Sequence, residues 1–211
     1  QEALNAAGYI TARRIATISA EVTGVIDSML VEEGMDVREG QVVATLDSSI
    51  AKVALDLAQA RVESAKVRLH STRAEIEEAK RVLARVSELK GGNYSSEAQR
   101  TRAETDLTKF VSALDSIQAD IRVQQLMTKQ QQELFNKHTI RAPFPGVVTV
   151  KAAQPGEIIA PGGYAGAGIC TIVDMTSLEI EVDVNEAFIG KVFPGQKVLA
   201  NLDAYPKWEI P

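Results

Sequence analysis

The chain has 211 residues, of which 45% are hydrophobic and 24% are charged, and this ordinary globular composition argues against a disordered chain. Its formal net charge of −5 and its lack of a basic block argue against nucleic-acid binding, because phosphate recognition needs clustered Lys and Arg. The single cysteine, Cys170, excludes an intramolecular disulfide and a cysteine-based metal site.

The two ends of the chain predict that it is a piece of a longer protein. It begins at Gln1 without an initiator Met or a signal peptide, and it ends at Pro211 just as a further strand starts. The sequence contains no run of about 18 apolar residues, so no membrane-spanning helix is expected in it. We therefore expect that a native membrane anchor has been removed.

Residues 18–40, "ISAEVTGVIDSMLVEEGMDVREG", are the first predicted β region, because short β-branched runs alternate with Gly at turn spacing. The pattern returns without a gap at 140–162, "IRAPFPGVVTVKAAQPGEIIAPG", at an offset of 122 residues. The matched positions are Ile18/Ile140, Gly24/Gly146, Val25/Val147, Ile26/Val148, Gly34/Gly156, Val37/Ile159 and Gly40/Gly162, with Leu46-Asp47 against Val173-Asp174 after a short extra loop. Neither copy is large enough for a core of its own, so the two units are expected to pair face to face.

Two predicted helices joined by a turn lie between these copies. From about Ser49 to Lys90 there is no Pro or Gly, and apolar or small residues recur in alternating steps of three and four, which is a heptad seam. This seam consists of Leu55, Ala58, Val62, Ala65, Leu69, Thr72, Ile76, Ala79, Leu83 and Val86, and after the turn it resumes at Ala103, Leu107, Phe110, Leu114, Ile117 and Ile121. Each helix has roughly 40 residues and would be about 60 Å long.

Folding the chain back at 91–94 predicts an antiparallel coiled coil in which the numbers of facing residues sum to 186. Small residues then oppose large ones, as interdigitated packing requires. The predicted pairs are Leu83 with Ala103, Ala79 with Leu107, Ile76 with Phe110, Leu69 with Ile117 and Ala65 with Ile121. Beyond Ile121 two alternatives are open: a polar continuation through Gln124, Thr128 and Gln131, or a change of phase toward Val123, Met127 and Leu134.

Residues 178–206, "LEIEVDVNEAFIGKVFPGQKVLANLDAYP", predict a strand, a short helix from about Asn185 and a second strand. This segment, together with "GYITARRIATISAEVTGVI", "VEEGMDVREGQVVATLD" and "IRAPFPGVV", resembles the periplasmic adaptor, or membrane fusion protein, family (HlyD-like) over nearly the whole chain. The two matched halves resemble the biotinyl/lipoyl carrier fold, and the long hairpin inserted between them resembles that of the adaptors.

The resemblance implies an α+β fold with a split biotinyl/lipoyl-like β domain, a long inserted antiparallel α-helical coiled-coil hairpin, and part of a β-barrel domain. The expected parts are an N-terminal strand region of the barrel at 1–17, the two lipoyl-like halves at 18–47 and 138–174, the hairpin at 48–137 with its tip near 90–96, and the partial barrel at 175–211.

The function implied is that of a periplasmic adaptor anchored to the inner membrane of a Gram-negative cell. It would bridge an inner-membrane transporter of the RND or ABC type and a TolC-type outer-membrane channel, as one of six identical copies in a ring. Neither an enzyme nor a cofactor is implied. The alternatives are a lipoyl/biotinyl carrier domain of an acyl or carboxyl transfer enzyme, and a purely structural coiled-coil protein.

Several residues that could carry chemistry have plainer explanations. A carrier presents a modified lysine, usually beside a methionine, where this chain inserts its hairpin, and Lys52 and Lys137 have no Met neighbour there. His70 and His138 lack further ligands at metal spacing. Cys170 is expected to be buried, and the acid pairs Glu32-Glu33 and Glu77-Glu78 are expected to be solvated.

The turn itself contains the candidate site. Arg85, Leu89 and Ser96 fit the spacing R-x-x-x-L-x-x-x-x-x-x-S, which resembles the tip motif by which these adaptors engage the outer-membrane channel. Structural explanations stand beside this one. Ser96 and Gln99 form a capping box for the second helix, and Leu89 can close the seam. Arg85 directly precedes the seam residue Val86 and should point partly outward, so contact with a partner explains it better.

Overall fold

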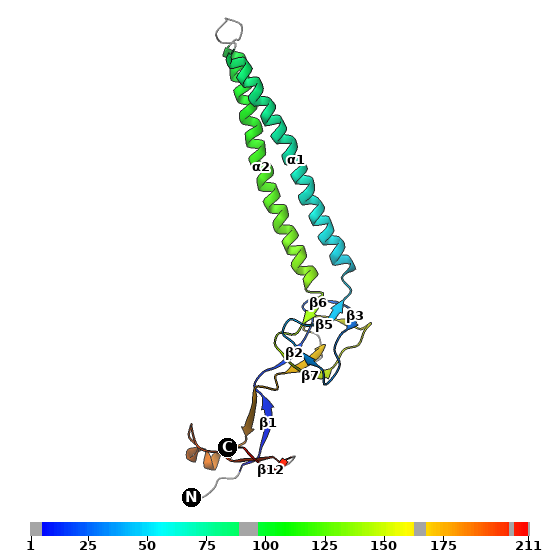
Figure 1. Ribbon diagram of the computed structural model, residues 1–211, viewed down its shortest axis with the longest axis vertical. Coiled ribbons are helices and arrows are strands. Elements are labelled where there is room, and N and C mark those ends of the chain that lie inside the picture. The colour runs from blue at the N-terminus through cyan, green and yellow to red at the C-terminus, as the bar shows by residue number, and fades with distance from the viewer. Residues whose placement is uncertain (1–5, 89–96, 163–167, 203–204, 211) are drawn as a thin grey trace. The chain divides into compact units, whose positions relative to one another are not determined.

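The computed structural model describes residues 6–88, 97–162, 168–202 and 205–210. The chain divides into two compact units, of which residues 16–172 form one and residues 1–15 with 173–211 form the other. The first unit contains a β-sandwich and, inserted into it, the helical hairpin (Figure 1).

The hairpin consists of α1 (Ser49–Glu88) and α2 (Glu97–Asn136), with 40 residues each. At about 1.5 Å per residue, each helix is roughly 60 Å long, as predicted. Asp47 lies two residues before α1, and its Oδ1 accepts hydrogen bonds from the backbone N of Ser49 at 3.0 Å and from the Ser49 Oγ at 2.6 Å. The base of the hairpin is closed by a bond from Leu46 N to His138 O, 2.8 Å long.

The predicted seam lies on the face of α1 that packs against α2. Seven of its residues are buried and the rest are half-buried; the buried ones are Leu55, Ala58, Val62, Ala65, Thr72, Ile76 and Ala79. On α2 the seam residue Ala103 is buried, whereas Leu107 and Phe110 are half-buried. An ion pair of 2.7 Å between Arg68 Nη2 and Asp120 Oδ2 joins the two helices, and its residue numbers sum to 188, close to the predicted 186.

Beyond Ile121 the structure selects the polar alternative. Gln124, Thr128 and Gln131 are half-buried and continue the seam. Val123, Met127 and Leu134 are exposed, with 48%, 45% and 39% of their surface accessible. The seam therefore keeps its phase to the base of the hairpin, and α2 leaves large apolar side chains on its outer surface.

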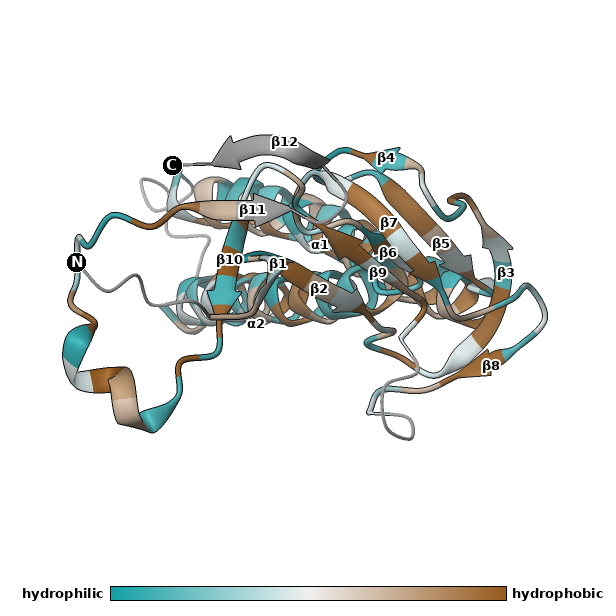
Figure 2. Cartoon of the chain, turned by 90° about the horizontal axis from the view of Figure 1, so that it is seen from below, coloured by the Kyte–Doolittle hydropathy of each residue, from teal (hydrophilic) through white to brown (hydrophobic). Residues whose placement is uncertain are grey.

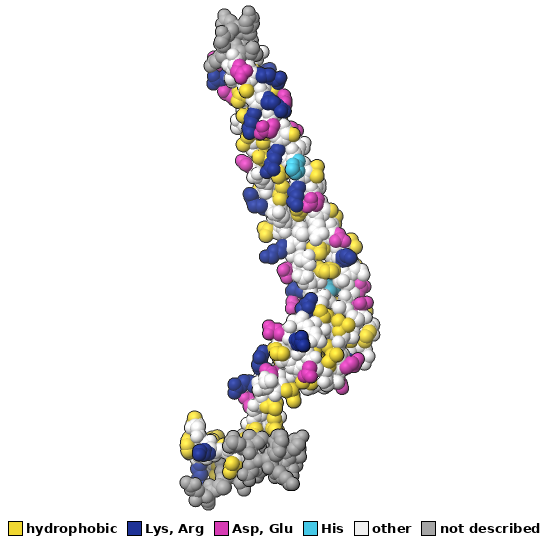
Figure 3. Space-filling model, in the orientation of Figure 1, with side chains coloured by type: hydrophobic (Ala, Val, Ile, Leu, Met, Phe, Trp, Pro, Cys, Tyr) yellow, Lys and Arg dark blue, Asp and Glu magenta, His cyan; other side chains and the backbone are white. Residues whose placement is uncertain are grey.

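The surface of the hairpin mixes apolar and charged side chains. On the face shown in Figure 3, hydrophobic side chains in yellow lie between Lys and Arg in dark blue and Asp and Glu in magenta along its length. Exposed apolar residues occur on both helices, among them Leu57 and Val67 of α1 and Leu126 of α2. Each helix therefore has apolar surface that the other helix does not cover.

The β-sandwich is made of two four-stranded sheets related by the sequence repeat (Figures 1 and 2). One has the order β2 (Ile15–Ile18), β9 (Cys170–Val173), β7 (Gly146–Lys151) and β4 (Asp36–Val37). The other has the order β6 (Thr139–Arg141), β5 (Val42–Leu46), β3 (Gly24–Met29) and β8 (Ile158–Ile159).

Backbone hydrogen bonds repeat across the two halves at the predicted offset. Ile26 N donates to Glu157 O at 2.8 Å, and the equivalent Val148 N donates to Met35 O at 3.0 Å. Gly34 and Gly156 occupy matching turns with φ of 83° and 89°, a left-handed conformation that glycine adopts without strain. The prediction that two copies of one β unit pair with each other is confirmed.

The core of this sandwich lies between the two sheets and draws on both halves. The side chains that are nearly or fully inaccessible are Ile26, Val31, Val43, Val148, Ile169, Cys170 and Ile172. In Figure 2 the strands of the sandwich carry brown, hydrophobic segments, most clearly on β7. Neither half would have enough inward-facing side chains to close such a core by itself.

In the other unit, β1 (Gly8–Ala12) pairs antiparallel with β10 (Leu178–Val182). A short 3₁₀ helix, η2 (Glu186–Lys191), follows β10, and the Asn185 side chain caps it by accepting from Ala187 N at 3.0 Å. The strands β11 (Ala200–Leu202) and β12 (Tyr205–Ile210) form a second antiparallel pair. The predicted order of strand, short helix and strand is thus present.

Candidate functional site

Arg85 lies in the last turn of α1, and 69% of its side chain is exposed. Its Nη2 is 3.5 Å from Glu78 Oε1, at the limit of a hydrogen bond, while Arg81 holds the other oxygen of Glu78 at 2.9 Å. Such exposed pairs are weak, because water and salt screen them. The guanidinium of Arg85 is therefore placed on the outside with most of its five donors directed to solvent.

The other two predicted site residues, Leu89 and Ser96, lie outside the described residues. Their place in the sequence puts them between the end of α1 at Glu88 and the start of α2 at Glu97. The structure therefore does not test whether the three residues of the motif come together.

A shallow groove lies between the helices below this end of the hairpin. Ala79, Val82, Ala103 and Phe110 form its apolar floor, and Glu75, Glu78 and Asp106 form an acidic rim. Sequence reasoning missed this rim, although the acids are spaced at three residues on α1 and Asp106 directly precedes the seam residue Leu107. The groove is open, and three carboxylates stand over an apolar floor in the part of the hairpin that the structure describes.

The other candidate residues have structural partners. Lys151 binds both members of one acid pair, through its Nζ to Glu32 and its backbone N to Glu33. Lys80 binds Glu77 at 2.9 Å and thereby holds the pKa of that carboxyl below its usual value. Glu32, Glu77 and Glu78 thus stand in ion pairs, and Glu33 accepts a hydrogen bond from the backbone.

Cys170 and the two histidines offer no reactive centre. Burial raises the pKa of the Cys170 thiol to about 11, so it stays protonated and is a poor nucleophile. His138 Nδ1 lies 2.9 Å from Leu134 O at the end of α2, and His70 is exposed. Within the described ranges, no three His, Cys, Asp or Glu side chains cluster in a way that could hold a metal ion.

The lysines at the base of the hairpin are placed as ordinary surface charges. Lys52 lies exposed in the first turn of α1, and Lys137 follows α2 and pairs with Glu21 at 3.0 Å. The β-turn that would present a carrier's lysine is replaced by the hairpin. In the part of the chain that the structure describes, no helix combines the length and the apolar character needed to cross a bilayer.

Comparison with known proteins agrees with this architecture. The family model of the CzcB-like barrel-sandwich hybrid domain matches residues 14–174. The macrolide export protein MacA of Yersinia pestis is 26% identical over 198 residues, which are 93% of this chain and 53% of MacA. The multidrug resistance protein MdtA of Klebsiella pneumoniae is 29% identical over 194 residues, 92% of this chain and 43% of MdtA. The chain thus spans about half the length of the curated relatives it matches.

Solved structures have the same fold. The crystal structure of MacA from Actinobacillus actinomycetemcomitans superposes with a TM-score of 0.83 at 23% identity, covering 92% of this chain and 60% of that one. The membrane fusion protein Spr0693 of Streptococcus pneumoniae superposes with a TM-score of 0.64 at 20% identity, covering 96% of this chain and 80% of that one.

A split β-sandwich that carries a long helical hairpin defines a class of adaptor proteins. The chain belongs to the periplasmic adaptor, or membrane fusion protein, family, within which it has the CzcB-like barrel-sandwich hybrid domain. The resemblance drawn from the sequence and the predicted fold class are both confirmed.

Proposed function

We propose that this chain is the adaptor part of a Gram-negative tripartite efflux or secretion pump, located in the periplasm and anchored to the inner membrane in the full-length protein. It bridges an inner-membrane transporter of the RND or ABC type and a TolC-type outer-membrane channel, in a ring of six copies. The observation that carries the proposal is the pair of 40-residue helices inserted between the two halves of the sandwich. A rod about 60 Å long can reach across an aqueous gap, and the groove along the described part of its seam is open.

The names of the relatives support the same function. MacA is named for macrolide export, MdtA for multidrug resistance, and PvdR of Pseudomonas aeruginosa, 26% identical over 195 residues, is named a pyoverdine export membrane fusion protein. The carrier alternative is not favoured, because Lys52 and Lys137 lie at the ends of helices and not at the tip of a β-turn.

The distal end of the hairpin is the proposed channel-binding site, with Arg85, Leu89 and Ser96 as its residues. Arg85 supplies a planar, permanently charged donor group to acceptor groups on the channel. Leu89 supplies an apolar anchor beside it, and Ser96 caps the second helix so that both are presented at a fixed angle. The exposed guanidinium with only a 3.5 Å contact to Glu78 supports this role.

A photoreactive amino acid placed at Glu88, in the protein as its native cells make it, tests the proposal. Irradiation should yield an adduct with an outer-membrane channel, identified by mass spectrometry, and the same probe at the mid-helix position Gln125 should not. Arg85→Ala should lower the adduct yield about tenfold, as expected when an interface arginine is lost. Leu89→Asp should lower it at least as much.

Lys80→Ala is the matched control, because Lys80 is also an exposed cation of α1 that pairs with an acid of its own helix, Glu77. Its adduct yield should equal that of the unchanged protein at equal expression. Equal yields for Arg85→Ala and Lys80→Ala would show that the arginine is not a channel contact, and the absence of any channel adduct from Glu88 would contradict the adaptor function.

A further inference from the structure

Two alanines in the seam explain why a groove forms between the helices below the distal end of the hairpin. Ala79 of α1 and Ala103 of α2 are both buried at this level, and their short side chains leave space that larger ones would fill. Val82 and Phe110 stand beside them and are half-buried. The groove has a volume of about 260 Å³. It is thus slightly smaller than the roughly 300 to 1,000 Å³ typical of pockets for drug-sized ligands.

The residues that line this groove recur at the same spacing on both helices. They are Glu75, Glu78, Ala79 and Val82 on α1, and Ala103, Asp106 and Phe110 on α2. Steps of three and four residues keep each set on one face of its helix. From Glu75 to Val82, and likewise from Ala103 to Phe110, the helix rises by roughly 10 Å. The groove is therefore short, and its length suits a small molecule better than a helix of another protein.

Two of the three carboxylates on the rim have no ion-pair partner within the described ranges. Glu78 is held by Arg81 at 2.9 Å and lies 3.5 Å from Arg85. Glu75 and Asp106 are exposed, and neither takes part in an ion pair with another described residue of the hairpin. The rim therefore keeps two negative charges that a ligand can neutralise.

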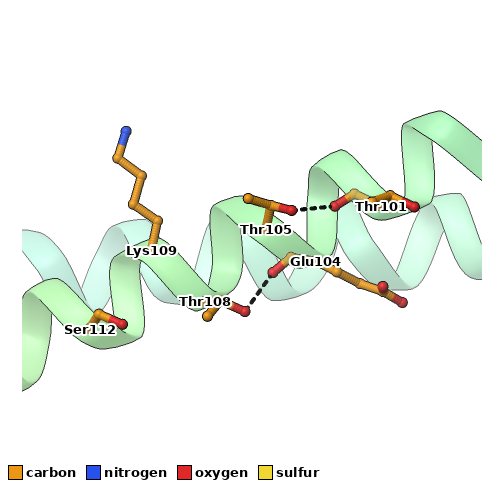
Figure 4. Close-up of a pocket in the computed structure, with 6 residues that line it drawn as sticks. All are labelled: Thr101, Glu104, Thr105, Thr108, Lys109 and Ser112. Carbon is orange, nitrogen blue, oxygen red and sulfur yellow. Dashed lines mark hydrogen bonds between the residues drawn. The ribbon is translucent and has the colours of Figure 1, made fainter.

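The cations closest to Asp106 in sequence leave it unpaired. Arg102 and Lys109 are four residues before it and three residues after it on α2, yet no ion pair between described residues joins either one to Asp106. Lys109 belongs to a second shallow groove on α2, which Figure 4 shows with Lys109 extending away from the helix.

This second groove offers a comparison on the same helix. Hydroxyl and charged side chains line it, namely those of Thr101, Glu104, Thr105, Thr108, Lys109 and Ser112 (Figure 4). Thr105 donates to Thr101 O at 2.8 Å and Thr108 donates to Glu104 O at 2.9 Å, so both hydroxyl donors are used within the helix. Its polar lining gives an apolar ligand much less to cover than the alanines, valine and phenylalanine of the first groove do.

An organic cation with an apolar chain matches both features of the first groove. The chain removes the half-buried Val82 and Phe110 side chains from water, which is favourable in proportion to the area covered. The positive charge complements Glu75 and Asp106, whereas an anion of the same shape would be repelled by them. A quaternary ammonium group suits this site well, because it has no hydrogen-bond donor to satisfy and is attracted to the face of an aromatic ring such as that of Phe110.

We propose that this groove binds an amphiphilic organic cation. The charged group lies beside Glu75 and Asp106, and the apolar chain covers the floor formed by Val82, Phe110 and the two alanines. The inference goes beyond the adaptor function, because it assigns a ligand to the hairpin itself and does not require a contact between the distal end and a channel.

Methyl NMR spectroscopy of the whole chain tests the proposal, with the octyltrimethylammonium ion as the probe. Its addition should shift the methyl signals of Val82 and Ala103 to saturation and should leave those of Thr105 and Thr108 in the second groove unchanged. Octyl sulfate has the same chain with the opposite charge, and tetramethylammonium has the same charged group without the chain. Each of these two ions should bind about tenfold more weakly, or less, because each lacks one of the two contacts.

Glu75→Gln with Asp106→Asn removes both unpaired charges at unchanged size. This double variant should bind octyltrimethylammonium about tenfold more weakly, while its binding of octyl sulfate should not decrease. Asp115→Asn with Glu133→Gln is the matched control, because both residues are exposed acids of α2 outside the groove. The control should bind the cation as tightly as the unchanged chain does.

Equal affinity for the cation and for octyl sulfate, or equal affinity of the two double variants for the cation, would overturn the proposal. Shifts at Thr105 and Thr108 as large as those at Val82 would also overturn it, because they would indicate general adsorption of the probe. Two other occupants would be recognised by the same signals. Shifts at Val82 and Ala103 on raising the protein concentration alone would indicate a second copy of the chain, and shifts with a lysine-rich peptide but not with octyltrimethylammonium would indicate a basic protein segment. Either result would contradict a small cationic ligand.

Discussion

The sandwich and the hairpin contain the same kinds of apolar residue but bury them to different depths. Ile26 and Val148 in the sandwich are 1% and 0% exposed, because two sheets enclose them from opposite sides. Leu69 and Phe110 occupy the seam of the hairpin and are only half-buried, because each helix has a single neighbour. The two-helix rod excludes water from its seam only in part, since Ala65 is 0% exposed while Leu69 and Phe110 remain half-buried. The hairpin therefore leaves apolar surface accessible that the sandwich encloses.

The largest effect that would test this contrast is expected from truncation in the core of the sandwich. Ile26→Ala should lower the free energy of unfolding of the sandwich by about 3 kcal/mol, from lost transfer energy plus the cavity that remains. Val148→Ala, at the equivalent place in the other half, should lower it by about 2 kcal/mol, since one methylene fewer is removed. Hydrogen exchange measured by mass spectrometry on β3 and β7 reports both values. Losses below about 1 kcal/mol in both would mean that the sandwich core is as loosely closed as the hairpin seam.

The second-largest loss of stability is expected at Gly168, where the backbone lies close to that of Ile18. A Cβ added at Gly168 would meet the side-chain methyl of Thr17 and lie 2.7 Å from Ile18 O, inside the sandwich. Gly168→Ala should therefore lower stability by about 2 kcal/mol through overpacking. Gly190→Ala is the control, because nothing lies within 4 Å of its added Cβ. Equal melting curves for the two variants would contradict the close packing of β2 against β9.

In the hairpin, truncation of an apolar side chain should lower the free energy of unfolding by less than it does in the sandwich. Phe110→Ala is expected to lower stability by about 1.5 kcal/mol, well under the 3 to 5 kcal/mol typical of a fully buried phenylalanine, because its ring lines an open groove. Val111→Ala, one residue away and outside the seam, should be close to neutral. Circular dichroism at the helical minimum measures both. A loss of about 4 kcal/mol at Phe110 would mean that the seam is as well sealed as the sandwich.

The smallest expected effect on stability is at two carboxylates, Asp47 directly after β5 and Asp174 directly after β9. Hydrogen bonds from Ser49 lower the pKa of Asp47, and those from Thr176 lower the pKa of Asp174. A lowered folded-state pKa stabilises the fold above the unfolded value, which is about 3.9, and this stability is lost as pH falls through the folded-state pKa. Asp47→Asn and Asp174→Asn should thus be less stable than the unchanged chain at pH 7, and the difference should shrink toward zero in acid. A difference that persists in acid would exclude the charge as its cause.

Periodic features of the fold could be predicted from the sequence, and single contacts could not. The heptads of both helices and the repeat that relates Ile26 to Val148 are visible as spacing, so the hairpin and the paired halves were predictable. The choice of Gln124 over Met127 for the lower seam was not predictable, because the sequence left both phases open and only the packing against α1 decides between them. The approach of Gly168 to Ile18 joins segments about 150 residues apart and leaves no local signal.

The candidate site was predictable only in part. The outward position of Arg85 followed from its place beside Val86, and its contact with Glu78 follows from a spacing of seven residues, or two helical turns. The acidic rim of the groove needs both helices at once, so no single stretch of sequence indicates it. The channel-binding role of Arg85, Leu89 and Ser96 stays a prediction.

Asp47 and Asp174 occupy the same place in the two halves, and each closes a local turn with the residue two positions later, Ser49 or Thr176. After Asp47 the chain enters a helix, and after Asp174 it enters β10. Because each turn is completed by hydrogen bonds of its own, the sandwich is finished before the chain leaves it, and the segment after each turn is free to vary. The sandwich thus carries two attached segments, the hairpin after Asp47 and β10 after Asp174, and each is joined to it through a turn that is complete in itself. Evolution, or an engineer, can exchange a hairpin of another length between Asp47 and His138 and so change the reach of the protein without redesigning its core.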